Sequence, residues 1–196
     1  MLEKLMRSDA EVKTLGIVLF EDGLHLREIA RRAGISPPEA KRELDNLVSL
    51  GIIKKQSRGN QVLFTPNTKC PFFNELRGIY IKTEGVAGQL RKSILDLRDA
   101  KYAFIYGSMA NGNFSEKSDV DVLIIGNINE EEVVRSISNS QKGVGREINW
   151  VLWSERDFAN KLKENGSFIN SLLKGKKIWL AGDYDEFERI TSKAVG

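Results

Sequence analysis

The stretch GSMANGNFSEKSDVDVLIIG, residues 107–126, decides the fold that we expect for this chain. Its second half is a run of branched apolar residues, which predicts a buried strand, yet Asp119 and Asp121 stand at the start of that run. Side chains alternate along a strand, so both carboxylates project from one face, with their Cα atoms about 6.6 Å apart. Two like charges at that spacing repel each other, and a divalent cation between them removes the repulsion. Because Mg²⁺ prefers hard oxygen ligands, the pair predicts a magnesium site.

The preceding segment KYAFIYGS, residues 101–108, predicts a second strand that ends in a Gly-Ser turn. A glycine at a strand end lets the backbone approach a ligand closely. The N–H groups that follow Gly107 and the hydroxyl of Ser108 can donate hydrogen bonds to phosphate oxygens. Phosphate donors next to a metal site predict a nucleoside triphosphate site. Each signal also has an ordinary interpretation, because Gly-Ser is a common dipeptide and Asp-x-Asp can be a solvated strand end.

Residues 107–125 resemble the signature of the DNA polymerase β-like nucleotidyltransferase superfamily. The likeness is greatest to its minimal nucleotidyltransferases, whose motif runs roughly GSxARGxxxxxSDxDLxV. The chain departs from this motif at Asn111, where that group usually has an arginine that could steady the triphosphate. The matching residues are Gly107, Ser108, Ala110, Gly112, Ser118, Asp119 and Asp121.

The resemblance implies a mixed β-sheet flanked by helices and a nucleotidyl transfer reaction. It implies that Gly107 and Ser108 grip the β- and γ-phosphates of an NTP such as ATP. It also implies two Mg²⁺ ions held by Asp119, Asp121 and a third carboxylate from a later strand. Glu147, which opens the predicted strand REINWVLW, is the best candidate for that third ligand and for a general base, although charged residues at strand starts are also ordinary. The acceptor hydroxyl, on a protein, an RNA end or a small molecule, stays open.

The first third of the chain predicts three short helices followed by a hairpin. Apolar residues recur at helical spacing in residues 9–20, 25–33 and 36–50, and Ser36 with the two prolines after it is typical of a helix start. The segment IIKKQSRGNQVLF, residues 52–64, reads as two short strands joined by a turn at Gly59. This order resembles the winged helix-turn-helix domains of microbial transcriptional regulators.

The winged-helix resemblance implies double-stranded DNA as a partner, with the third helix in the major groove and the hairpin on phosphates. Positive charge supports it, since residues 25–69 hold nine Lys or Arg against four acids, whereas residues 70–196 hold eighteen of each. A protein-binding winged helix with a solvated face is the alternative. The expected DNA-contacting residues are Pro38, Lys41 and Arg42 on the helix, and Lys54, Lys55 and Arg58 on the hairpin.

We therefore expect an α+β chain with a winged helix-turn-helix domain at 1–68, a linker at 69–77 and a nucleotidyltransferase domain at 78–196. Nearly the whole chain resembles prokaryotic proteins that fuse these two modules and are described as predicted regulators. No segment is typical of a signal peptide or a membrane span, and Cys70 is the single cysteine, so we expect a cytoplasmic protein in which Cys70 has a structural role.

Two alternatives to the enzyme remain. One is a transcriptional regulator whose second domain only senses nucleotide. The other is a component of a toxin-antitoxin pair with a partner protein, either a toxin or a modification target. The oligomeric state stays open, with a homodimer among the states expected.

Overall fold

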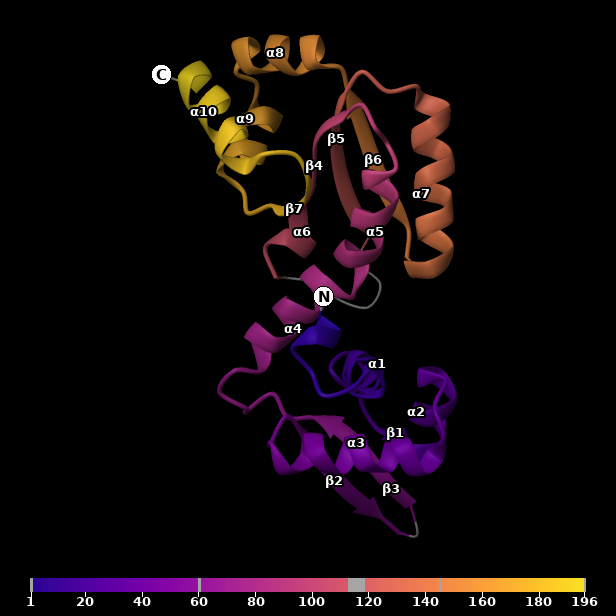
Figure 1. Cartoon of the computed structure of the whole chain (residues 1–196). Coiled ribbons are helices and arrows are strands. Elements are labelled where there is room, and N and C mark those ends of the chain that lie inside the picture. The colour runs from indigo at the N-terminus through magenta and orange to yellow at the C-terminus, as the bar shows by residue number, and fades with distance from the viewer. Residues whose placement is uncertain (1, 60, 113–118, 145, 196) are drawn as a thin grey trace. The chain divides into compact units, whose positions relative to one another are not determined.

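A computed structural model describes residues 2–59, 61–112, 119–144 and 146–195 (Figure 1). The chain divides into two compact units, Met1–Gly85 and Val86–Gly196. Among the described residues, none of the helices has the length and apolar character needed to cross a membrane.

The first unit combines helices with a small antiparallel sheet. Its three strands are hydrogen-bonded in the order β1-β3-β2, and β2 and β3 form the expected hairpin, with Arg58 opposite Gln61. The helices predicted from the apolar spacing are confirmed. The elements are a 3₁₀ turn η1 (Leu2–Lys4), α1 (Asp9–Val18), β1 (Leu24–His25), α2 (Leu26–Ala33), α3 (Pro37–Ser49), β2 (Ile53–Arg58), β3 (Gln61–Pro66) and α4 (Phe73–Thr83).

Local sequence explains where α3 begins. The Ser36 hydroxyl accepts a hydrogen bond from the backbone N–H of Glu39, and prolines occupy the first two helical positions, where a missing N–H costs nothing. Leu44 and Leu47 on the inner side of α3 are buried with Leu15 of α1. The helix is therefore specified by its cap and held by the core.

The segment 69–77, expected to be a linker, packs on the first unit instead. Cys70 and Phe73 are buried in the core of that unit, and Tyr80 of α4 lies 5.9 Å from the ring of Phe20 between centroids. The Pro- and Asn-containing sequence forms a turn in which the Cys70 N–H donates to the Asn67 carbonyl. Burying these apolar side chains favours their docking, so the boundary between the units falls after Gly85. Cys70 is buried in that core, as expected for a cysteine with a structural role.

The second unit is a four-stranded mixed sheet with helices on both faces (Figure 1). The strand order is β6-β5-β4-β7; β5 and β6 run parallel, and the other pairs are antiparallel. This confirms the expected mixed sheet. The elements are α5 (Val86–Leu95), β4 (Ala100–Tyr106), α6 (Gly107–Ala110), β5 (Val120–Gly126), α7 (Glu130–Val144), β6 (Ile148–Trp153), α8 (Glu155–Glu164), α9 (Ser167–Lys174), β7 (Ile178–Ala181) and α10 (Tyr184–Val195).

The two faces of this sheet differ in what covers them. On one face, Tyr102 and Phe104 of β4 and Leu123 of β5 pack in an aromatic core with side chains from α8, α9 and α10. The ring of Phe104 stacks on Trp179 at 5.1 Å and meets Phe187 edge-on at 5.5 Å. Helices α5 and α7 lie along the opposite face (Figure 1). The alternation of β5 therefore decides which helices neighbour each of its side chains.

Candidate active site

Asp121 lies at the start of β5, on the face of the sheet that carries the aromatic core, and Asp119 immediately precedes the strand. Asp121 pairs with Tyr106 of antiparallel β4 and with Asn149 of parallel β6, so these three side chains share one face. Asp119 precedes the strand and is exposed, whereas Asp121 is half-buried. The sequence thus correctly placed both carboxylates at a strand start, and the structure adds their neighbours on β4 and β6.

The backbone of Gly107, which directly follows β4, lies close to the side chain of Asp121 in β5. Gly107 adopts a φ of +75°, in the left-handed region that favours glycine. A Cβ atom at this position would lie 2.7 Å from Oδ2 of Asp121, closer than real Cβ contacts. Any other residue at 107 would therefore be strained and would push the carboxylate aside. The glycine expected to approach phosphates and an aspartate expected to hold metal meet at one point.

Tyr106 is the aromatic neighbour of this contact. Burial raises the pKa of its phenol, and the negative charge of Asp121 raises that pKa further. Tyr106 consequently stays neutral at physiological pH. Its ring packs edge-on against Phe168 of α9, with 6.0 Å between centroids.

A pocket of about 240 Å³ opens beside Gly107, and we refer to it as the Gly107 pocket. Ligand sites usually measure about 300–1,000 Å³, so this pocket can hold part of a nucleotide rather than all of it. Lys176 and Ser171 supply polar groups that the sequence analysis missed, because only the fold brings α9 and the chain after it next to α6. The lining residues are Tyr106, Gly107, Asn111, Phe168, Ser171, Leu172, Gly175 and Lys176.

The donor set is suited to a hard divalent cation. Asp119 and Asp121 offer carboxylate oxygens, and the backbone pairing places Glu147 beside them, since the Val120 N–H donates to the Glu147 carbonyl at 3.0 Å. Glu147 is exposed and immediately precedes β6. Within the described ranges, no group of three or more Asp, Glu, His or Cys side chains converges enough to hold one ion. The carboxylate oxygens are the kind of ligand that Mg²⁺ prefers, and in this structure the three described carboxylates are not gathered around one point.

The remaining residues of the signature lie close by. Ser108 is exposed in the short helix α6, and Asn111 ends that helix, its N–H donating to the Gly107 carbonyl at 3.2 Å. Ser118 lies outside the described residues.

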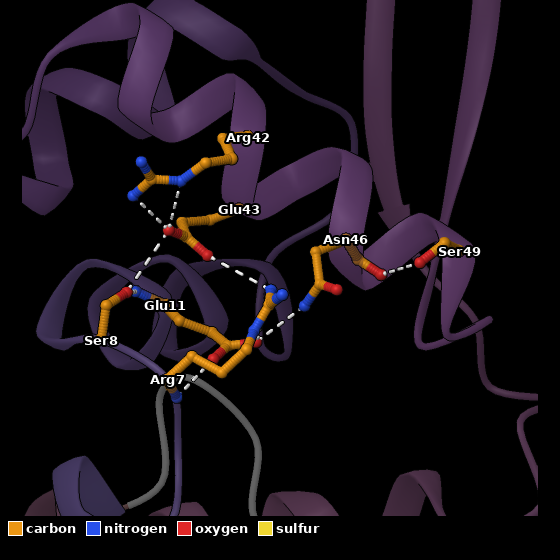
Figure 2. A network of polar contacts seen from close by, with 7 residues as sticks. All are labelled: Arg7, Ser8, Glu11, Arg42, Glu43, Asn46 and Ser49. Atoms are coloured by element: carbon orange, nitrogen blue, oxygen red, sulfur yellow. Dashed lines mark hydrogen bonds and ion pairs between the residues drawn. The ribbon is translucent and has the colours of Figure 1, made fainter.

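In the first unit, a network of polar contacts ties α3 to the segment before α1 (Figure 2). The Glu43 side chain is buried, yet Arg42 donates to its Oε1 from Nε at 3.1 Å and from Nη2 at 2.8 Å. Arg7 lies 3.7 Å from the other Glu43 oxygen and also pairs with buried Glu11. The hydrogen bonds that Arg42 donates to Glu43 raise the pKa of Arg42, so Arg42 stays charged. Arg42, expected to face DNA, is therefore already engaged within its own unit.

The other expected DNA-contacting residues are distributed over the surface of this unit. Pro38 and Lys41 of α3 are exposed. Lys54 and Lys55 are exposed and, being consecutive in β2, point to opposite faces of the hairpin. Arg58 belongs to β2, but its side chain lies outside the described part of the chain.

A mixed sheet that brings paired strand-start carboxylates to a glycine turn is the arrangement of a nucleotidyltransferase. Residues 88–180 match the family described as Nucleotidyltransferase domain. The chain is also 31% identical over 78 residues to the protein named "Putative protein adenylyltransferase MJ0604" of Methanocaldococcus jannaschii, covering 40% of this chain and 76% of that protein. The chain belongs to the nucleotidyltransferase family. Members of this family use nucleoside triphosphates and divalent metal ions.

Solved structures with a similar fold include a toxin-antitoxin complex with AMP-PNP, at 15% identity and a TM-score of 0.40, covering 56% of this chain and 83% of that one. Another is a tri-AMPylated HEPN toxin of Shewanella oneidensis in complex with its MNT antitoxin, at 12% identity and a TM-score of 0.34, covering 56% of this chain and 83% of that chain.

Proposed function

We propose that the second unit transfers a nucleoside monophosphate from an NTP to a hydroxyl group of a protein, with Mg²⁺ as cofactor. The observation that carries this proposal is the close approach of the Gly107 backbone to the Asp121 carboxylate, since an added Cβ would lie 2.7 Å from Asp121 Oδ2. Membership of the nucleotidyltransferase family supports the reaction class. The name of the archaeal relative, a protein adenylyltransferase, supports ATP as the donor and a protein as the acceptor.

The roles of the chain's own residues follow from where they lie. The absent Cβ of Gly107 lets a phosphate approach the backbone, and the exposed Ser108 hydroxyl can donate to a phosphate oxygen. Asp119, Asp121 and Glu147 would hold the divalent ions. Bound there, the ions would neutralise charge on the entering and departing oxygens of the transfer. Tyr106, neutral and half-buried, lies opposite Asp121 in the β4–β5 pairing.

The test of this reaction uses the full-length protein with Mg²⁺, cell extract and ATP labelled at the α-phosphate. Asp119→Asn should reduce label transfer to protein by at least about a hundredfold, because removing a group that stabilises transition-state charge costs this much in other enzymes. Asp185→Asn, an exposed change on α10, makes the same charge change away from the site and should leave transfer intact. Unchanged labelling by Asp119→Asn would refute the role of the aspartate pair.

We further propose that the first unit is a winged helix-turn-helix that binds double-stranded DNA. The element order α1-β1-α2-α3-β2-β3 supports it, as does the exposed position of Lys41 on α3. The affinity for duplex DNA should fall steeply with salt. Lys41→Gln should lower the slope of log K against log[salt] by about 1, and Lys174→Gln, in the other unit, should leave that slope unchanged. A protein with no measurable DNA affinity at low salt would contradict this assignment.

A regulator that senses nucleotide without turnover is the second candidate function, and Asn111 favours it because the resembling group usually has arginine there. This candidate predicts that ATP changes DNA affinity while no label is transferred. Both candidate functions allow a partner protein, which would be either the modification target or a toxin. A protein that co-purifies with the chain and becomes labelled would identify a target.

A further inference from the structure

The Gly107 pocket is lined by a neutral residue of the signature, Asn111, and by a lysine from another part of the chain, Lys176. Asn111 at the end of α6 and Lys176 after α9 both line it. An amide at position 111 brings no charge to meet a triphosphate. Lys176 brings one to the same pocket from a segment that the signature does not include.

The three lysines around Gly175 are not equivalent. Lys177 donates to the carbonyl oxygens of Leu173 at 2.8 Å and Gly175 at 3.1 Å, so its ammonium group is held by the backbone. Lys174, the last residue of α9, is exposed and does not line the pocket. Lys176 lines the pocket, and its ammonium group forms no hydrogen bond or ion pair with the residues that the structure describes. Of the three, Lys176 is the one available to a ligand in the pocket.

The backbone beside Lys176 is held on both sides. The Gly175 N–H donates to the Ser171 carbonyl at 2.9 Å, where α9 ends. A Cβ at Gly175 would lie 3.1 Å from that same carbonyl oxygen, so the turn is tight. The hydrogen bonds of Lys177 anchor the next residue. The hydrogen bonds of its two neighbours therefore fix the backbone of Lys176 beside the pocket.

We propose that Lys176 binds the polyphosphate of the nucleotide and supplies the positive charge that Asn111 lacks. An ammonium group offers three donors and a compact charge, which suits phosphate oxygens. This inference rests on the proposed function, since it needs a nucleoside triphosphate beside Gly107. Lys176 is thus a substrate-binding residue that the signature alone does not predict.

The test measures the affinity of the full-length protein for ATP and for inorganic tripolyphosphate in the presence of Mg²⁺. Lys176→Met should weaken both by about tenfold or more, the loss expected for one hydrogen bond between charged groups. Lys174→Met removes an equal charge two positions away and should change neither affinity. Lys176→Arg should retain most of the wild-type affinity, and Asn111→Arg in the Lys176→Met background should restore a large part of the loss.

The outcomes separate this inference from the proposed function. Should the wild-type protein bind neither ATP nor tripolyphosphate, the proposed function fails. Should it bind ATP while Lys176→Met binds equally tightly, only the inference on Lys176 fails. A loss for ATP without a loss for tripolyphosphate would place Lys176 on the nucleoside and would also overturn the inference.

Discussion

Replacing Gly107 by alanine tests the contact on which the site depends, and the size of the effect follows from the geometry. A non-glycine residue at a φ of +75° costs about 1–2 kcal/mol of stability. The added methyl group would lie 2.7 Å from Asp121 Oδ2, so the carboxylate has to turn away, at a further cost of about 0.5–1.5 kcal/mol for leaving its rotamer. The sum is about 1.5–3.5 kcal/mol. At roughly 4 °C per kcal/mol, the Tm of the second unit should fall by about 6–14 °C.

The measurement can be confined to the second unit because all three tryptophans, Trp150, Trp153 and Trp179, belong to it. Unfolding of the full-length chain followed by tryptophan fluorescence therefore reports that unit. Gly112→Ala is the matched control, since Gly112 has a φ of +82° but its Cβ would meet no atom of the described residues within 4 Å. It should show the backbone cost alone.

A double-mutant cycle isolates the contact. In an Asp121→Ala background, Gly107→Ala should cost no more than Gly112→Ala does, because the carboxylate oxygen is gone. Equal losses for Gly107→Ala in the presence and absence of the Asp121 carboxylate would show that the two residues do not touch, and the argument for the site would fail.

Two further predictions concern stability. Burial and the nearby Glu186 carboxylate raise the pKa of Tyr102 to about 12, so the unfolded chain loses this proton first. The free energy of unfolding should therefore fall between about pH 10 and pH 12, by roughly 3 kcal/mol at most. Tyr102→Phe should remove that part of the alkaline loss, as measured by tryptophan fluorescence, and an equal pH dependence in both proteins would contradict it. In the first unit, Glu43→Gln should raise the rate of amide hydrogen exchange in α3. The free energy of unfolding of this unit should fall by about 1.5–3 kcal/mol, because the hydrogen bonds that Arg42 donates would no longer meet a charged acceptor. Arg42→Gln should cost less than Glu43→Gln, because the Arg42 side chain is 68% exposed and solvent screens its charge. A larger loss for Arg42→Gln than for Glu43→Gln would show that the network in Figure 2 is not what stabilises α3.

Local signals predicted most of the elements in both units. The cap at Ser36, the turn at Gly59 and the apolar run after Asp121 each act over a few residues, and the structure has α3, the β2–β3 hairpin and β5 where these signals place them. Local signals did not predict how residues 69–77, expected to be a linker, pack on the first unit. Proline and asparagine after the hairpin indicate a turn, but whether the chain then leaves the unit depends on whether Phe73 finds a core to enter.

The sequence by itself predicted paired carboxylates at the start of β5, because the alternation of side chains along one strand can be read locally, and Asp121 lies in that strand with Asp119 immediately before it. Only the tertiary structure decided what those carboxylates meet. The β4–β5 register brings Gly107 against Asp121, and the packing of α9 beside α6 brings Lys176 into the Gly107 pocket. The position of the carboxylates depends on the alternation of side chains along a strand, which can be read from a few neighbouring residues. The approach of Lys176 to Gly107 depends on contacts between segments some seventy residues apart. The burial of the aromatic core sets these contacts, and no local sequence pattern predicts that burial.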